Sequence, residues 1–167
     1  MSALPWLALA APAVIPAAIT MVNLLTWTRG RPNGKSDARI SVLIPARDEE
    51  ATIEACVTAA LASEHRVDEV VVFDDASTDG TSAILARLAA AHPRLRVVNG
   101  HGLPQGWVGK PHACHQLSKH ATGDVLVFVD ADTTLTPQGL SRLLSLLDRA
   151  DLITAFPHQR TGTFAER

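Results

Sequence analysis

Short apolar runs that end in charged or turn-forming residues recur along this chain, and they predict buried β-strands. The runs are apolar at nearly every position, which is typical of parallel strands covered by helices on both faces. Segments with helical spacing alternate with them, so we expect a mostly parallel α/β sheet. The expected strands are residues 40–45, 70–73, 95–98, 125–129 and 152–156, the third of them near an edge. The expected helices are residues 49–62, 79–91 and 136–148.

Acidic residues directly follow three of the expected strands. Asp130 and Asp132 come after the fourth apolar run, Asp74 and Asp75 come after the second, and residues 47–50 (Arg-Asp-Glu-Glu) follow the first. Because the carboxyl ends of parallel strands meet at one edge of a sheet, we expect these charges to lie together. Ligands of open α/β sheets bind at that edge.

The pattern Asp130-Ala131-Asp132 indicates a site for a divalent metal ion. Alternate residues of an extended segment point the same way, so both carboxylates can reach one cation. Oxygen ligands suit Mg²⁺ or Mn²⁺, which usually bridge carboxylates and phosphates. Acids at strand ends also serve as helix caps or turn formers. The other acidic strand ends favour the metal site over this alternative.

A turn-rich loop, residues 103–111, precedes a further expected helix and carries Trp107 and Lys110. A lysine at the start of a helix opposes the positive end of the helix dipole. A bound anion would explain this position, because a helix N-terminus binds phosphate and Lys110 would add a full charge. The alternative is a solvated lysine beside a surface turn.

The N-terminal segment predicts a membrane anchor. Residues 2–28 contain no charged side chain, and residues 4–27 are long enough to cross the roughly 30 Å hydrocarbon layer as a helix. Arg29, Arg31 and Lys35 follow, so we expect a single-pass protein of the cell membrane with its domain in the cytoplasm. A cleaved signal peptide fits poorly, because no basic residue precedes the apolar stretch. The expected organisation is an anchor (1–28), a linker (29–38) and one domain (39–167).

Composition narrows the classes of function. The 167 residues include 15 Lys and Arg against 17 Asp and Glu, a net charge of −2, which argues against a nucleic-acid partner. Cys56 and Cys114 fall in expected helices, and we expect them to be reduced packing residues. His112, Cys114 and His115 lack the spacing of a closed tetrahedral zinc site.

Four motifs follow one another along the chain: residues 44–50 (IPARDEE), 74–81 (DDASTDGT), 106–110 (GWVGK) and 130–132 (DAD). In this order they resemble the motifs of the family 2 glycosyltransferases, whose GT-A fold is a Rossmann-like sheet that binds nucleotide-diphosphate sugars. The Gly-Trp-x-Gly-Lys element further resembles the membrane-anchored branch associated with hopanoid and carotenoid glycosylation. The similarity runs from about residue 40 to residue 156, nearly all of the expected domain.

The resemblance implies a binding site for a nucleotide-diphosphate sugar, with a UDP-sugar as the first expectation. Pro45, Ala46 and Glu49 would line the nucleoside pocket. Asp75, supported by Asp74, would contact the base.

It also implies the remaining donor contacts. Lys110 would lie near the phosphates, and Asp130 would lie toward the sugar and ribose. Asp132, together with Asp130, would bind the Mg²⁺ or Mn²⁺ that bridges the diphosphate. Residues 47–48, Arg-Asp, stand where many relatives have an aromatic residue or arginine followed by asparagine.

The implied activity is metal-dependent transfer of the sugar to a lipid or polyprenyl-type acceptor. An inverting transfer needs a carboxylate base, which the family places well after the Asp-x-Asp motif. We therefore expect the base and the acceptor half to be missing from a chain that stops at Arg167, and the chain to be truncated. Three alternatives stay open. Glu49, Asp151, Glu166 or a partner could supply the base; the chain could be an inactive fragment or a non-catalytic nucleotide-sugar-binding module; or it could be a related nucleotidyltransferase.

Overall fold

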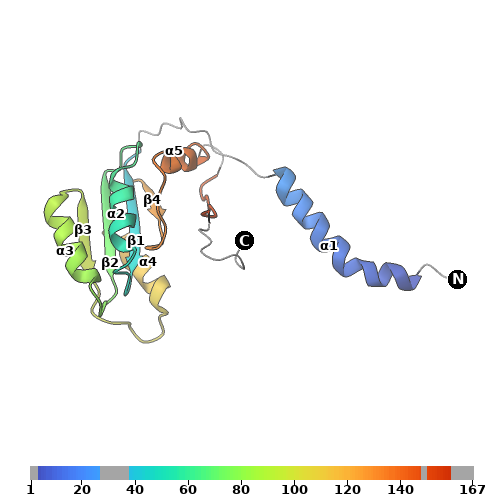
Figure 1. The fold of residues 1–167 in the computed structure, drawn as a ribbon, viewed down its shortest axis with the longest axis horizontal. Coiled ribbons are helices and arrows are strands. Elements are labelled where there is room, and N and C mark those ends of the chain that lie inside the picture. The colour runs from blue at the N-terminus through green and yellow to red at the C-terminus, as the bar shows by residue number, and fades with distance from the viewer. Residues whose placement is uncertain (1–3, 27–37, 148–149, 159–167) are drawn as a thin grey trace.

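Four parallel strands form one sheet with the order β3-β2-β1-β4 (Figure 1). The computed structural model describes residues 4–26, 38–147 and 150–158. The strands are β1 (Ile40–Ala46), β2 (Glu69–Asp74), β3 (Leu95–Asn99) and β4 (Val125–Phe128). The predicted parallel α/β sheet is confirmed, and so is the edge position of the third strand.

Helices cover both faces of the sheet. One face packs against α2 (Ile53–Leu61), α3 (Thr81–Ala91) and α5 (Gly139–Leu144), and the other packs against α4 (Gly109–His120). The alternation of side chains along β1 sends Val42 and Ile44 to the first face and Leu43 to the second. These apolar layers hold the strand ends in place at the edge where the acidic loops emerge.

Two sequence-based expectations about strands are wrong. Residues 152–156 form no strand, and Leu152 and Phe156 are 87% and 80% exposed. The apolar pattern is present there, but a strand also needs a neighbour with which to exchange hydrogen bonds. In addition, β4 is covered on one face only. Leu126 and Phe128 are exposed on its other face, because α4 packs over β1 and β2.

The expected helices exist but are shorter than predicted. Residues 49–52, placed in the first helix by the sequence, form a turn whose backbone is tied to the neighbouring loop. The last expected helix, residues 136–148, is helical only over Gly139–Leu144. Loop contacts of this kind depend on segments that are distant in sequence, so local periodicity does not predict where they end a helix.

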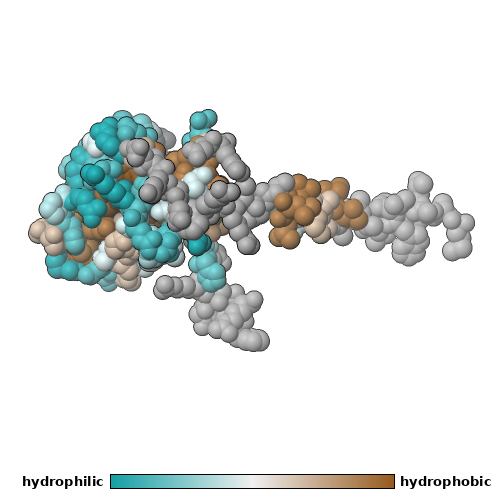
Figure 2. Space-filling model, turned by 90° about the horizontal axis from the view of Figure 1, so that it is seen from above, coloured by the Kyte–Doolittle hydropathy of each residue, from teal (hydrophilic) through white to brown (hydrophobic). Residues whose placement is uncertain are grey.

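The expected anchor contains a helix, α1 (Leu4–Thr26), which stands apart from the sheet in Figure 1. Its apolar side chains between residues 14 and 25 are exposed, and they make a hydrophobic surface in Figure 2. The structure confirms a helix here but not a membrane span: among the described residues, no helix combines the length and hydropathy needed to cross a membrane. Nearly all of the expected linker, residues 29–38, lies outside the described residues.

Candidate functional site

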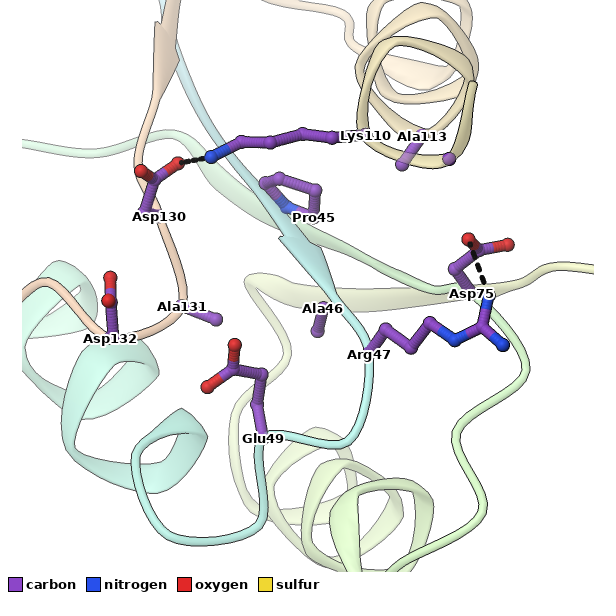
Figure 3. Close-up of a pocket in the computed structure, with 11 residues that line it drawn as sticks. Pro45, Ala46, Arg47, Glu49, Asp75, Lys110, Ala113, Asp130, Ala131 and Asp132 are labelled. Carbon is purple, nitrogen blue, oxygen red and sulfur yellow. Dashed lines mark ion pairs between the residues drawn. The ribbon is translucent and has the colours of Figure 1, made fainter. Parts of the chain in front are cut away.

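A pocket of about 320 Å³ opens at the edge of the sheet where β1, β2 and β4 end (Figure 3). Ligands bind at this edge in open α/β sheets. Six of the seven predicted donor-binding residues line the pocket, as do both predicted metal ligands; the exception is Asp74. The lining residues are Pro45, Ala46, Arg47, Glu49, Asp75, Gly109, Lys110, Ala113, Asp130, Ala131 and Asp132.

The segment after β4 presents its two acids to the pocket. Asp130 and Asp132 are exposed there, whereas Ala131 between them is buried and also lines the pocket. The sequence predicts an extended segment here, but residues 131 and 132 form a turn. The carbonyl oxygen of Asp130 accepts hydrogen bonds from the Thr133 N–H at 2.9 Å and the Cys56 thiol at 3.5 Å. Burial, with help from the nearby carboxylates, raises the pKa of Cys56 to about 12. The thiol therefore stays protonated and holds this turn as a donor.

Lys110 lies in the first turn of α4 and reaches across the pocket to Asp130. Its Nζ atom is 2.7 Å from Asp130 Oδ1, and the two side chains are 63% and 55% exposed (Figure 3). The hydrogen bond to Asp130 raises the pKa of Lys110, against the opposing effect of partial burial. The unpaired N–H groups of the α4 N-terminus lie beside it, so this part of the pocket favours anions.

The loops after β1 and β2 are joined by hydrogen bonds that involve Asp48. Its backbone φ angle is 54°, in the left-handed region that asparagine and aspartate tolerate better than most residues. The N–H of Asp48 donates to Ser77 Oγ at 3.0 Å. Asp48 Oδ1 accepts hydrogen bonds from the N–H and the hydroxyl of Thr78 at 2.6 and 3.1 Å. Aspartate at this position therefore both tolerates the backbone conformation and supplies the acceptor that holds Thr78.

Two further carboxylates line the pocket from these loops. Asp75 is buried, and its Oδ2 atom lies 3.8 Å from Arg47 Nη1. Glu49 is anchored at both ends, because its N–H donates to Thr81 Oγ1 at 2.8 Å and its carboxylate accepts from Thr52 Oγ1 at 2.7 Å. Each side chain thus enters the pocket with one side engaged by protein and the other facing the cavity.

Asp74 is buried beside Asp75 but turns away from the pocket. Its carboxylate accepts a hydrogen bond from the Ser77 N–H at 3.0 Å and another from the Ser82 hydroxyl. These contacts join the end of β2 to the loop and to the first turn of α3. The structure therefore gives Asp74 a role in shaping the loop that carries Asp75.

The loop before α4 is held by aromatic packing. Trp107 stacks on His115 with ring centroids 5.0 Å apart and meets His112 edge-on at 5.5 Å. His112 is buried and reaches Phe73 of β2 at 5.9 Å. Gly106 has a φ angle of 86°, which requires glycine before this packed tryptophan. The loop is thereby fixed to both helix and sheet, and it places Lys110 at the pocket.

Four lining residues are absent from the set predicted from the sequence: Arg47, Gly109, Ala113 and Ala131. Three of them belong to motifs that carry predicted residues, so motif membership was a usable signal for them. Ala113 lies three residues after Lys110, and only helix geometry reveals that both reach the same cavity.

The charge of the pocket fits a bound cation. Its lining contributes two cationic side chains, Arg47 and Lys110, and four carboxylates, which leaves a formal charge of −2. A diphosphate alone would be repelled by that excess, whereas a divalent ion would balance it. Within the described ranges, no group of three or more His, Cys, Asp or Glu side chains could hold a metal by itself. Asp130 and Asp132 match the mode in which one or two carboxylates share the ion with substrate phosphates.

The parallel sheet and the acid-lined pocket at its carboxyl edge define a glycosyltransferase domain of the GT-A type. Solved structures of similar fold support this class. The mannosyltransferase PcManGT from Pyrobaculum calidifontis, in complex with GDP-Man and Mn²⁺, has a TM-score of 0.70 and 29% identity, over 83% of this chain and 41% of its own. Glucosyl-3-phosphoglycerate synthase from Mycobacterium tuberculosis, in complex with Mn²⁺, UDP and phosphoglyceric acid, has a TM-score of 0.57 and 30% identity. That match covers 73% of this chain and 45% of the synthase.

The chain belongs to glycosyl transferase family 2, whose sequence model matches residues 41–166. Among curated proteins, it is 33% identical over 112 residues to 4,4'-diaponeurosporenoate glycosyltransferase of Staphylococcus haemolyticus (strain JCSC1435). That match covers 67% of this chain and 28% of the relative, so the chain spans less than a third of the relative's length. The predicted resemblance to a carotenoid-associated branch of the family is confirmed.

Proposed function

We propose that this chain forms the donor-binding part of a metal-dependent glycosyltransferase that moves a sugar from a nucleotide diphosphate to a lipid acceptor. The observation that carries the proposal is the meeting of Asp130, Asp132, Lys110 and Asp75 around one pocket at the carboxyl edge of the sheet. These residues come from three separate segments of the chain. Their types match the three parts of the ligand, namely base, diphosphate and metal.

The nucleoside would occupy the side of the pocket formed by the loops after β1 and β2. Pro45 and Ala46 offer apolar contact, and Glu49 offers an acceptor for ribose hydroxyls. Asp75 is buried and held at the pocket wall, so it can accept a hydrogen bond from a ring N–H of the base. Arg47 beside it offsets the charge of Asp75.

The diphosphate would lie between the N-terminus of α4 and the segment after β4. Lys110 and the first N–H groups of α4 supply positive potential there. Asp130 and Asp132 would hold Mg²⁺ or Mn²⁺ against the phosphates. When bound, the ion would neutralise the charge that develops on the leaving diphosphate. The presence of Mn²⁺ in two structurally similar glycosyltransferases supports this assignment.

We infer a UDP-sugar as donor, with a GDP-sugar as the competing choice. One similar structure holds UDP and another holds GDP-Man. The base of each nucleotide has a ring N–H that could donate a hydrogen bond to Asp75. The hydroxyl groups of the sugar would be contacted by residues on the open side of the pocket.

The test is calorimetric titration of the full chain with UDP, UDP-glucose and GDP-mannose, with and without Mn²⁺. We expect Mn²⁺-dependent binding of one nucleotide class and its loss in the Asp130→Ala/Asp132→Ala double variant. An Asp124→Ala variant removes a carboxylate at the opposite end of β4 and is the matched control. Metal-independent binding, or binding that survives the double variant, would contradict the proposal.

We propose that none of the described carboxylates of the pocket serves as the catalytic base. Three carboxylates of this chain are candidates for the base. Glu49 lines the pocket, but its carboxylate accepts a hydrogen bond from the Thr52 hydroxyl. Asp151 is exposed and does not line the pocket. Glu166 lies outside the described residues. We therefore expect the chain to bind donor without efficient transfer, as a nucleotide-sugar-binding module would. Rapid transfer to a lipid by the isolated 167-residue chain, abolished by Glu49→Gln, would overturn this expectation.

We further propose that the acceptor is a lipid and that α1 attaches the chain to the cell membrane, with the domain on the cytoplasmic side. The name of the staphylococcal relative specifies a carotenoid-type acceptor, diaponeurosporenoate. Most of the exposed side chains of α1 between residues 14 and 25 are apolar, and basic residues 29, 31 and 35 follow the helix in the sequence.

Vesicle flotation tests the attachment. The full chain should float with liposomes, and Leu24→Lys/Leu25→Lys should remain in the soluble fraction. Leu152→Lys, at an exposed leucine outside α1, should float like the wild type. Equal flotation of all three proteins would contradict attachment through α1.

A further inference from the structure

The ion pair between Lys110 and Asp130 joins two residues that the proposed function assigns to different ligands. Lys110 Nζ lies 2.7 Å from Asp130 Oδ1, and the lysine side chain runs from α4 past Pro45 to reach it (Figure 3). Among the described residues, Asp130 has no other ion-pair partner. The ammonium group therefore occupies the position that a cation would take on Asp130 Oδ1.

This ion pair competes with binding of the metal at Asp130 and of the phosphate at Lys110. A metal on Asp130 would bring a dication next to the Lys110 ammonium, and like charges at such short range repel. A phosphate at the α4 N-terminus would in turn offer Lys110 a new anionic partner within reach of its flexible side chain. Departure of Lys110 toward the phosphate thus removes the obstacle to the metal.

We propose that Lys110 and Asp130 form an exchange pair that makes binding of the divalent ion and of the nucleotide diphosphate depend on each other. Without nucleotide, Lys110 neutralises Asp130 and disfavours the metal. With nucleotide, Lys110 pairs with the diphosphate and Asp130 becomes available as a ligand. The inference rests on the proposed function, since it requires that both ligands use this pocket.

The exposure of the pair sets the size of the effect. Both side chains are more than half exposed, so the ion pair is weak and can open readily. An exposed pair of this kind corresponds to at most about a fivefold change in an equilibrium constant. Coupling between two ligands is reciprocal, so nucleotide should tighten metal binding by the same factor by which metal tightens nucleotide binding.

The other cation of the pocket provides a matched comparison. Arg47 lies 3.8 Å from Asp75, on the nucleoside side, and forms no ion pair with Asp130 or Asp132 among the described residues. Removing either charge makes the pocket more negative by one unit. Only removal of Lys110 also frees the carboxylate of Asp130, so the two variants separate exchange from a general change in charge.

The experiment measures Mn²⁺ binding to the full chain by electron paramagnetic resonance, with and without UDP, for the wild type, Lys110→Met, Lys110→Arg and Arg47→Met. Without UDP, we expect Lys110→Met to bind Mn²⁺ about two- to fivefold more tightly than the wild type. With Mn²⁺, the same variant should bind UDP about tenfold more weakly, because a charged hydrogen-bond donor is lost. Lys110→Arg should keep most of the coupling, and Arg47→Met should change Mn²⁺ binding without UDP by less than Lys110→Met does.

A folding defect would weaken the binding of both Mn²⁺ and UDP. For Lys110→Met we expect tighter Mn²⁺ binding and weaker UDP binding, a combination that a purely structural effect would not produce. Unchanged or weaker Mn²⁺ binding by Lys110→Met without UDP would overturn the exchange pair while leaving the proposed function intact, provided the wild type binds UDP and Mn²⁺ together. An equal gain in Mn²⁺ affinity for Lys110→Met and Arg47→Met, measured without UDP, would also overturn the exchange pair. If the wild type binds no UDP, GDP or nucleotide sugar with Mn²⁺, both proposals fail.

Discussion

Asp48 and Thr78 join the loop after β1 to the loop after β2. Asp48 Oδ1 accepts a hydrogen bond from the Thr78 N–H at 2.6 Å and a second from the Thr78 hydroxyl at 3.1 Å. The first loop carries Arg47 and Glu49, and the second begins with Asp75, so this contact fixes two walls of the pocket relative to each other. A residue that does not line the pocket thereby determines its shape.

Replacement of Asp48 by alanine should destabilise the fold and loosen the pocket. The variant loses two hydrogen bonds and places alanine at a φ angle of 54°, for a combined cost of about 2 kcal/mol. Urea denaturation measures the change in the free energy of unfolding. The Asp48→Asn variant would keep a hydrogen-bond acceptor and would tolerate the positive φ angle. The free energy of unfolding of this variant should therefore fall by less than about 1 kcal/mol. Equal losses in both variants would contradict this account.

Ala76 offers a stabilising change at the same edge. Its φ angle is 56°, where a side chain is strained and glycine is not, so Ala76→Gly should raise the free energy of unfolding by about 0.5–1 kcal/mol. The control is Ala83→Gly, at an exposed position inside α3, which should lower it by about 1 kcal/mol. Thermal or urea unfolding of the two variants should therefore shift in opposite directions. A loss of stability in Ala76→Gly would show that its side chain contributes packing that outweighs the strain.

The adjacent acids Asp74 and Asp75 should respond differently to the same substitution. Asp75→Asn should weaken nucleotide binding about tenfold with little change in stability, because Asp75 lines the pocket. Asp74→Asn should lower the free energy of unfolding by about 1–2 kcal/mol, because its carboxylate holds Ser77 and Ser82. Calorimetry and urea denaturation on both variants provide the comparison. The reverse assignment of effects would mean that Asp74 is the ligand contact.

Stability should fall in acid partly through Glu69 at the start of β2. Burial raises its pKa, but hydrogen bonds from Ser41 and Thr122 and the charge of Arg96 outweigh burial and leave the pKa below the ordinary value of 4.5. A carboxyl group with a lowered pKa in the folded state stabilises the protein above the ordinary value. That stabilisation is lost as the pH falls below 4.5 toward the folded-state pKa.

The Glu69→Gln variant isolates this contribution. The difference in unfolding free energy between wild type and variant should be largest near neutral pH and should shrink below pH 4.5. Urea denaturation at a series of pH values measures it. A difference that stays constant across the series would show that Glu69 does not titrate between the folded and unfolded states in the way its contacts predict.

The sequence by itself determined the strands of the sheet, their parallel arrangement and the edge that carries the site. These features follow from local information, namely continuous apolar runs and the acids that directly follow them. Residues 130–132 are an example, because two acids directly after an apolar run predict that both carboxylates reach one pocket at the strand end. Seven of the eleven residues that line the pocket are among those that the motifs predict.

Only the tertiary structure decided how these charged groups pair. Asp74 and Asp75 are the same residue type side by side, yet one binds its own loop and the other lines the pocket. Lys110 and Asp130 are twenty positions apart and meet because α4 packs across β1 and β2, from where Lys110 reaches the segment after β4. Residues 152–156 have the pattern of a strand, but no strand among the described residues pairs with them. Pairing of this kind depends on the distance between segments in the folded protein. Neither the hydrophobic period nor the composition of one segment predicts that distance.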